Sequence, residues 1–267
     1  DLRVGGAQGV RGGPREVTRA HASDGCGCFP TGRHYPGIAH LLRVNVRGVA
    51  EEFPAEKPWR ELDVALLDVE TTGRDASVDR VVEVGIVVGR HGEVVSRYNW
   101  LINPGMKIPA EVTAVHGISD DDVKDSPRFE AVAHEIAAAL SGCVPAAYNA
   151  AFDKAFILGE FARARAATER TFADVPALRR EVDWVDPLIW ARDIQSNEKS
   201  RALGDVAARL GIALENAHRA SDDAEAALRV LYALGKDPRI PDAYGALVQE
   251  QRRLGQKQAD ERRYWRG

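Results

Sequence analysis

Apolar and polar positions follow two different periods along the middle of the chain. The segment at 62–70 is almost continuously apolar before it ends in acids, and similar runs occupy 80–89 and 92–103. Short apolar runs bounded by turn residues are typical of buried strands. The turn "RHG" between the second and third runs contains a glycine and predicts an antiparallel hairpin.

Helical spacing takes over after residue 125. Apolar residues recur at intervals of three and four in segments 126–142, 151–166, 202–212 and 221–235. A short strand is expected at 143–150, and 181–194 reads as a strand running into a helix. Three strands followed by alternating strands and helices favour an α/β domain with a mixed sheet.

The pattern divides the chain into three parts. Residues 1–60 are rich in Gly and Arg, show no sustained period, and are interpreted as a poorly ordered leader. The periodic part, 61–235, is expected to form the folded domain, and 236–267 is expected to be a polar, Arg-rich helical tail.

Composition narrows the class of protein. The chain has 267 residues, is 45% hydrophobic and carries a formal net charge of −4. No global basic field attracts nucleic acid, so a polyanionic substrate has to meet local positive charge or metal. No apolar run approaches the length of a membrane helix. Only three cysteines occur, and Cys26 and Cys28 are too close in sequence for an ordinary bridge, which indicates a cytoplasmic setting.

Two acids end the first predicted strand. In "VALLDVETTG", Asp68 and Glu70 are two residues apart and therefore share a face of the strand with Val64 and Leu66. The C-terminal edge of an open α/β sheet is where ligands usually bind. Two neighbouring carboxylates repel each other unless a cation neutralises them, and hard divalent ions favour such oxygen ligands. An isolated D-x-E is, however, more often a solvated pair.

Two further segments carry candidate chemistry. Asp153 follows the short strand in "YNAAFDKAF", where a helix begins, and it could simply interact with the helix dipole. In "HRASDDAEAAL", Ser221 or Asp222 is the expected N-cap, which places Asp223 in the first helical turn. His218 precedes this helix and, taken alone, is more often a surface histidine than a catalyst.

Together these segments resemble a known family. "DVETTG", "YNAAFD" and "HRASDDA", in this order, resemble the three motifs of the DEDDh 3′–5′ exonucleases, in particular the DnaQ-like proofreading subunits of the DNA polymerase III epsilon type. Segment 102–123 and "VDPLIWAR" are also similar to family segments, and the resemblance covers 61–235. One departure is Tyr148, where family members usually have histidine.

The resemblance implies a ribonuclease-H-like fold, with a five-stranded mixed sheet flanked by helices. It implies that four acids bind two divalent metal ions, Mg²⁺ or Mn²⁺, and that a histidine is the general base; these residues are Asp68, Glu70, Asp153, Asp223 and His218. It further implies substrate contacts from Thr71, Thr72, His116, Asn149 and Phe152, for each of which a purely structural role is the alternative.

The expected function is hydrolysis of the terminal phosphodiester at a single-stranded or frayed 3′ end, with release of nucleoside monophosphates. DNA is favoured over RNA as the partner, and a DNA polymerase subunit is a possible second partner, which would make this a proofreading enzyme. The alternatives are an RNA 3′-end-trimming exonuclease and a catalytically silent module that binds a nucleic-acid end or a protein. Arginines in 163–180 could supply local positive charge, although a solvated helix face is equally compatible with them.

Overall fold

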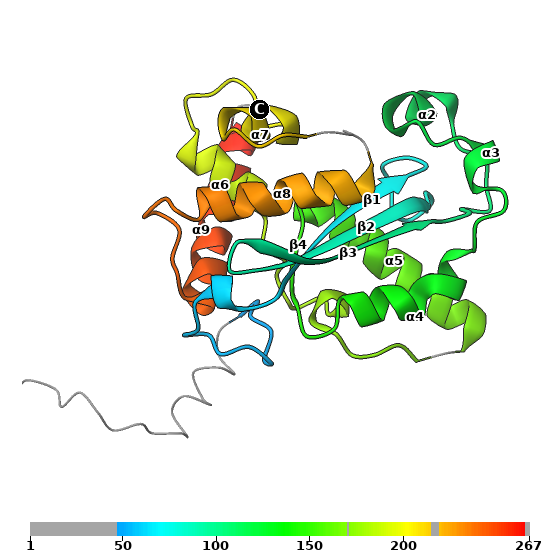
Figure 1. Cartoon of the computed structure of the whole chain (residues 1–267), viewed down its shortest axis with the longest axis horizontal. Coiled ribbons are helices and arrows are strands. Elements are labelled where there is room, and N and C mark those ends of the chain that lie inside the picture. The colour runs from blue at the N-terminus through cyan, green and yellow to red at the C-terminus, as the bar shows by residue number, and fades with distance from the viewer. Residues whose placement is uncertain (1–46, 170, 215–218, 265–267) are drawn as a thin grey trace, which may run out of the picture. The chain divides into compact units, whose positions relative to one another are not determined.

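A mixed four-stranded sheet forms the centre of the computed structural model, which describes residues 47–169, 171–214 and 219–264. The strand order is β3-β2-β1-β4, with bounds β1 Val64–Thr71, β2 Val81–Arg90, β3 Glu93–Leu101 and β4 Val144–Ala146. The first three strands are antiparallel neighbours, whereas β4 runs parallel to β1 (Figure 1). The expected hairpin is present: His91 and Gly92 both have positive φ, as its tight turn requires.

Strand β1 is covered on both faces, which explains its apolar sequence. Val64 and Leu66 belong to one hydrophobic core, and Ala65, Leu67 and Val69 belong to a second core on the opposite face. Successive side chains of a strand point to opposite faces, so the two cores lie on either side of the sheet. On the first face, this cover gives way to Asp68 and Glu70 near the end of the strand.

Helices form a layer on each face of the sheet (Figure 1). Helices α4 and α5 contribute to the core of Leu67, while α6, α7, α8 and α9 contribute to the core of Leu66. Their bounds are α4 Phe129–Ala139, α5 Ala150–Thr168, α6 Pro187–Ile194, α7 Leu203–Arg209, α8 Ala220–Leu234 and α9 Tyr244–Tyr264. Four short elements complete the described chain: η1 Trp59–Glu61, α2 Ala110–His116, α3 Asp120–Val123 and η2 Pro176–Leu178.

The prediction of a fifth strand has to be corrected, because the sheet has four strands within the described residues. Val185 pairs with Ala146 through a single parallel bridge, and no longer ladder forms there within the described residues. The chain turns away at once because Asp186 caps α6 and Pro187 occupies its first turn. Proline lacks a backbone N–H and fits the start of a helix better than the middle of a sheet.

A second correction concerns the start of α8. The helix begins at Ala220, so neither Ser221 nor Asp222 is its N-cap. The backbone N–H of Ala220 instead donates to the carboxylate of Glu83 at 3.1 Å. A distant strand residue therefore satisfies the helix terminus, which a local capping pattern cannot reveal.

Segments on both sides of the periodic part pack against it. Residues 47–60 fell within the expected leader, yet Ala50, Phe53 and Trp59 are buried in the core of Leu66. Helix α9 buries Tyr244, Leu247 and other residues of one face in the same core. The other expectations for the leader fall on residues 1–46, outside the described residues. Among the helices described, none combines the length and apolarity needed to cross a membrane.

Candidate active site

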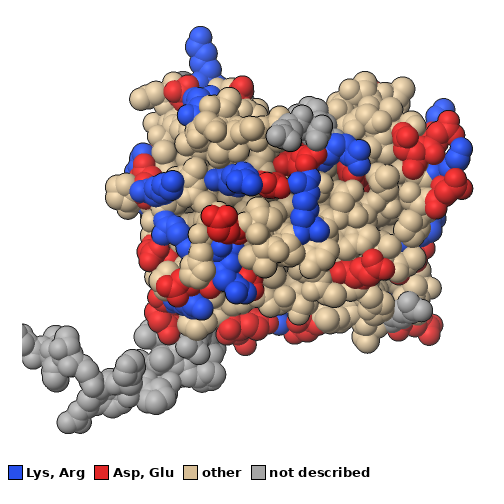
Figure 2. Space-filling model, viewed as in Figure 1, with Lys and Arg blue, Asp and Glu red and all other residues tan. Residues whose placement is uncertain are grey.

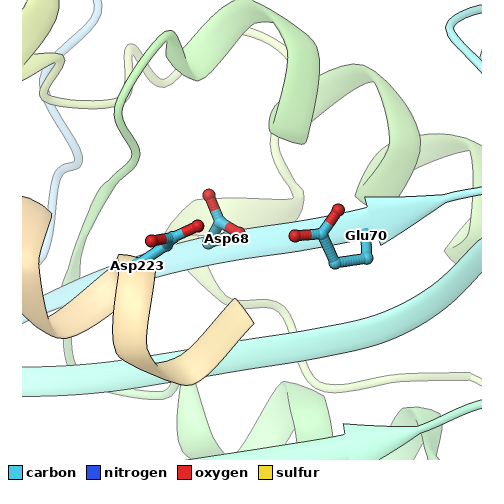
Figure 3. Close-up of side chains that lie close together, drawn as sticks. All are labelled: Asp68, Glu70 and Asp223. Atoms are coloured by element: carbon cyan, nitrogen blue, oxygen red, sulfur yellow. The ribbon is translucent and has the colours of Figure 1, made fainter. Parts of the chain in front are cut away.

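Three carboxylates meet at the end of β1 (Figure 3). Asp68 and Glu70 project from β1 and Asp223 from α8, and one carboxylate oxygen of each lies within 4.8 Å of the others. Asp223 is 153 positions beyond Glu70 in the chain, so only the packing of α8 on the sheet brings them together. Asp68, Glu70 and Asp223 are hereafter called the acidic triad.

The close approach of α8 to β2 depends on Gly85. A Cβ at this position would lie 2.2 Å from the backbone carbon of Ala220, closer than atoms can approach without displacement. Gly85 also pairs with Asp68 across β1 and β2. The absence of a side chain thus lets the first turn of α8 lie against β2 at the position paired with Asp68.

Glu83 fixes the same helix end electrostatically. Its side chain is fully buried and accepts hydrogen bonds from Ala220 N at 3.1 Å and from Asn99 Nδ2 at 2.9 Å. Arg219 Nη2 forms an ion pair with it at 2.7 Å. A buried carboxylate with two hydrogen-bond donors and a guanidinium partner is well satisfied, so Glu83 anchors the residue that immediately follows His218.

Asp153 enters from α5 beside the acidic triad. Its Oδ1 accepts a hydrogen bond from Val69 N at 3.1 Å, between Asp68 and Glu70 on β1, and the side chain is buried. It is not one of the three carboxylates that converge within 4.8 Å. Its negative charge nevertheless reaches the triad, because it contributes to raising the pKa of Asp68.

The start of α5 is held by Asp186, the N-cap of α6. The two carboxylate oxygens of Asp186 accept hydrogen bonds from Asn149 N at 3.0 Å and Ala150 N at 3.1 Å. Asn149 has a left-handed φ of 71°, which asparagine tolerates better than most residues. This explains Asn149 as a conformational residue of the helix start, one turn before Asp153.

Burial and mutual repulsion make the acidic cluster unfavourable in its fully ionised form. Burial raises the pKa of Asp68 well above its ordinary value, and the charges of Asp153, Glu70 and Asp223 raise it further. Burial also raises the pKa of Glu70 to about 8, with contributions from Asp223 and Glu83, although Arg219 opposes this shift. The Arg219 guanidinium does not offset the effects that raise the pKa of Glu70.

The donor set fits a divalent cation. Three carboxylate oxygens are close enough to share one ion, and they are the hard ligands that Mg²⁺ and Mn²⁺ favour. A bound cation would also remove the repulsion that raises the pKa values of Asp68 and Glu70. The acidic triad is therefore a candidate metal site.

Three of the expected substrate contacts lie around the C-terminal end of β1. Thr71 and Thr72 are buried, and the Thr71 carbonyl is 3.3 Å from Nε2 of the buried His116. His116 Nδ1 accepts from Ile118 N at 3.0 Å, so its Nε2 carries the proton and donates to Thr71. The structure thus brings His116 to the end of β1, where it supports the loop.

The remaining expected residues line the start of α5. Phe152 is partly buried and packs on Phe156, with ring centroids 4.8 Å apart. The hydroxyl of Tyr148, the departure from the family pattern, donates to the Arg201 carbonyl at 2.6 Å. His218, the expected general base, lies outside the described residues, so its role stays a prediction.

Sequence reasoning missed Glu83, Arg219 and Asp186, which position the acids without being among them. One signal was available: Glu83 interrupts the otherwise apolar run "RVVEVGIVVG". An acid within a buried strand requires a partner, and the partner proves to be Arg219.

Two of the four described arginines of segment 163–180 form ion pairs within the protein. Arg163 pairs with Glu160 at 3.1 Å, and Arg179 pairs with Asp174 and Glu52. Arg170 lies outside the described residues. On the face shown in Figure 2, lysine and arginine are interspersed with aspartate and glutamate. The paired arginines of this segment are therefore poor candidates for the local positive charge that a polyanion requires.

The fold and the acidic triad define a candidate nuclease, and comparison with known proteins places it in a family. Residues 65–231 match the RNase T family model, which is described as exonuclease. The chain belongs to this 3′–5′ exonuclease family, in the DnaQ-like group that the motifs predicted, and this confirms the resemblance.

Curated relatives include much longer proteins. The chain is 33% identical over 206 residues to the PolC-type DNA polymerase III of Streptococcus pneumoniae, with 75% of this chain and 13% of that protein covered. It is 30% identical over 160 residues to the 3′–5′ exonuclease DinG of Staphylococcus saprophyticus, with 60% of this chain and 17% of that protein covered. The chain thus spans less than a fifth of each relative.

Solved structures share the fold at lower identity. Exonuclease X in complex with 5′ overhanging duplex DNA has a TM-score of 0.53 and 18% identity, covering 70% of this chain and 99% of that chain. A structure of exonuclease I has a TM-score of 0.58 and 16% identity, covering 66% of this chain and 41% of that chain. These similarities confirm the expected α/β, ribonuclease-H-like exonuclease fold, with four strands described here.

Proposed function

We propose that the protein is a metal-dependent 3′–5′ exonuclease that hydrolyses the terminal phosphodiester of single-stranded or frayed DNA and releases nucleoside monophosphates. The observation that supports this most directly is the acidic triad, three carboxylates within 4.8 Å of one another in a chain of an exonuclease family. Loop 71–72 and His116 lie at the same end of β1, where a terminal nucleotide would be held.

In this proposal Asp68, Glu70, Asp153 and Asp223 hold two divalent cations, Mg²⁺ or Mn²⁺. When bound, such ions activate water and stabilise the departing 3′ oxygen in an in-line displacement at phosphorus. Asp153 accepts the N–H of Val69 and so is oriented toward β1. Glu83 and Arg219 hold the start of α8, which carries Asp223.

His218 takes the proton of the attacking water. This assignment rests on the family motif "HRASDDA", since His218 is outside the described residues. Imidazole has an unperturbed pKa near 6.5, so a neutral histidine can act as a base near physiological pH. Thr71, Thr72, Asn149 and Phe152 are proposed to shape the pocket for the last nucleotide.

DNA is the proposed substrate because relatives and structural neighbours act on or contain it. The PolC-type relative is a DNA polymerase III, and the exonuclease X structure contains duplex DNA with a 5′ overhang. Unpairing a mismatched end costs less than unpairing a matched one, which gives a frayed end an advantage. A proofreading role beside a polymerase is the corresponding proposal for a partner.

The test compares Asp68→Ala with wild type on single-stranded DNA, on a 3′-mismatched primer–template and on short RNA, with Mg²⁺ or Mn²⁺. We expect kcat to fall by roughly a thousandfold or more, because loss of metal-derived charge stabilisation is worth several kcal/mol. Asp121→Ala is the matched control, because this aspartate lies on α3 with 91% of its side chain exposed.

Two outcomes would contradict the proposal. Equal degradation of DNA by wild type and Asp68→Ala would identify the activity as a contaminant. Faster degradation of RNA than of either DNA substrate would replace the DNA assignment with RNA 3′-end trimming. Calorimetry with Mn²⁺ provides the binding readout, in which Asp68→Ala loses affinity and Asp121→Ala retains it.

A further inference from the structure

Three arginines converge on a pocket between α6, the loop after it and α9. The pocket has a volume of about 720 Å³ and is lined by Arg192, Arg201 and Arg262, together with Leu188, Ser196, Ala202, Gln258 and Glu261. The arginines come from three separate segments of the chain. Arg192 lies on α6, Arg201 precedes α7, and Arg262 is in the last turn of α9.

None of these three guanidinium groups forms an ion pair with a carboxylate among the described residues. Nearby acids have other partners: Asp193 pairs with Arg239, and Glu198 with Arg209. Glu261 lines the pocket, but its carboxylate lies 3.9 Å from Lys257 Nζ. This contrasts with Arg163 and Arg179 of segment 163–180, which are both paired.

Polar atoms in the wall of this pocket also have no partner. Nε of Arg201 and Oε1 of Gln258 are both buried, and neither forms a hydrogen bond. One other nitrogen of each side chain has a partner, since Arg201 Nη2 donates to the Ser196 carbonyl and Gln258 Nε2 donates to the Ile189 carbonyl. A buried N–H without an acceptor is costly, so the wall offers an unsatisfied donor beside three positive charges.

The pKa of Arg192 reflects repulsion from the other two guanidinium groups of the pocket. Burial lowers this pKa, and the positive charges of Arg262 and Arg201 lower it further, although Asp186 and Tyr148 oppose the shift. Mutual repulsion among guanidinium groups is relieved when an anion binds between them. Arginine presents a planar set of donors that matches the oxygens of a phosphate.

We propose that Arg192, Arg201 and Arg262 form a phosphate-binding site for the substrate strand, upstream of the 3′ end that enters the acidic triad. Phosphate is the shared chemistry of an internucleotide linkage and of a free nucleoside monophosphate, and the experiment separates these sources. The inference deepens the proposed function because it assigns the positive charge that the net charge of −4 does not supply.

Two contacts connect this pocket with the start of α5, the helix that carries Asp153. Tyr148, next to Asn149, donates its hydroxyl proton to the Arg201 carbonyl at 2.6 Å. Asp186 caps α6, the helix of Arg192, and also holds the start of α5, the helix of Asp153. The same backbone therefore positions the phosphate-binding site and one acid of the active site. Phosphate contacts of this kind position a strand without reading its sequence.

The experiment uses the full chain and compares Arg262→Gln with Arg263→Gln. Both arginines lie in the last turn of α9, but Arg263 pairs with Asp260 and does not line the pocket. The probes are a 12-nucleotide single strand, a dinucleotide, thymidine monophosphate and hexaglutamate. Binding is measured in EDTA at several salt concentrations, and KM and kcat are measured with Mg²⁺.

For Arg262→Gln we expect affinity for the 12-nucleotide strand to fall about three- to fivefold at low salt, with kcat retained. The slope of log affinity against log salt should decrease by about 0.7, the value for one phosphate contact on a single strand. The dinucleotide should be unaffected if the site holds an upstream linkage. Loss of thymidine monophosphate binding instead would identify the released nucleotide as the ligand.

Equal affinities and salt slopes for Arg262→Gln and Arg263→Gln, with every probe, would overturn the phosphate-binding site. Stronger binding of hexaglutamate than of the 12-nucleotide strand, lost only in Arg262→Gln, would replace phosphate with an acidic peptide. The result is separable from the proposed function. A wild type that binds the strand through Arg262 but never cleaves it would keep this site and refute the exonuclease.

Discussion

The half-buried acidic triad and the buried Glu160 have opposite electrostatic surroundings. Glu160 on α5 is 1% exposed, and Arg80 donates to its two oxygens at 2.8 and 2.9 Å, with Arg163 at 3.1 Å. The acidic triad has Arg219 as the cation that lowers the pKa of Glu70. Burial opposes ionisation at both places, yet the pKa of Glu160 is lowered and those of Asp68 and Glu70 are raised.

The difference indicates what each group does. Glu160 is neutralised by the protein's own side chains and joins α5 to the loop before β2, so its role is structural. The pKa values of Asp68 and Glu70 stay raised despite Arg219, so the charge of these two carboxylates is left to be neutralised from outside, as a metal site requires. A buried acid is therefore informative about function only when its counter-charges are counted.

The largest expected effect on stability is at Glu160, whose charge is neutralised by arginine side chains. Arg80→Met should lower the free energy of unfolding by about 3 kcal/mol, because it leaves the buried Glu160 with Arg163 as its one paired cation. Denaturant unfolding measures this change. The matched control is Arg229→Met, which breaks an exposed pair with Glu225 on α8 and should cost no more than about 0.5 kcal/mol. Equal costs for the two variants would show that Glu160 is not the buried anchor described here.

In the acidic triad we expect a substitution to raise the free energy of unfolding instead of lowering it. Asp68→Asn, in metal-free protein at about pH 8, should raise the free energy of unfolding by about 1–2 kcal/mol, because a neutral amide removes repulsion from Asp153, Glu70 and Asp223. Thermal unfolding in EDTA provides the measurement. A lower Tm for Asp68→Asn than for wild type would mean that this carboxylate contributes to the fold as Glu160 does.

Local patterns were sufficient to predict several of these features. The period of two placed Asp68 and Glu70 on one face with Val64 and Leu66, and the structure has Val64 and Leu66 in one core with the two acids beyond them. The strands of the hairpin and the main helices also follow from periodicity. These features depend on residues close together in sequence, for which spacing is a sufficient guide.

Features that depend on distant residues were missed. The donors that satisfy Glu160 and Glu83 include Arg80 and Arg219, which are 80 and 136 positions away in the chain. The capping prediction for α8 was wrong for this reason, since Glu83 replaced a local cap. The prediction of a fifth strand was wrong because Asp186 and Pro187 start a helix where a longer ladder would have formed.

The smallest expected effect is a difference in the pH dependence of stability between Glu70 of the acidic triad and Glu160. The pKa of Glu70 is raised from 4.5 to about 8 in the metal-free protein, so the folded state holds a proton that the unfolded state releases within this window. Stability from this group is therefore present below pH 4.5 and is lost as pH rises toward 8. A divalent cation replaces the proton, so the increase in Tm caused by Mg²⁺ should be larger by about 2 °C at pH 8 than at about pH 6.

Glu160 should behave in the opposite way. Its lowered pKa gives stability that is present above its unfolded value of 4.5 and is lost only as pH falls through the folded value, with or without Mg²⁺. Differential scanning fluorimetry of wild type and Arg80→Met, from acidic pH below 4.5 up to pH 8, measures the stability that Glu160 and Glu70 contribute. A Mg²⁺-induced shift that is equal at pH 6 and pH 8 would contradict proton–metal competition at Glu70. Acid sensitivity unchanged by Arg80→Met would contradict the contribution assigned to Glu160, since the low pKa of Glu160 depends on the Arg80 guanidinium.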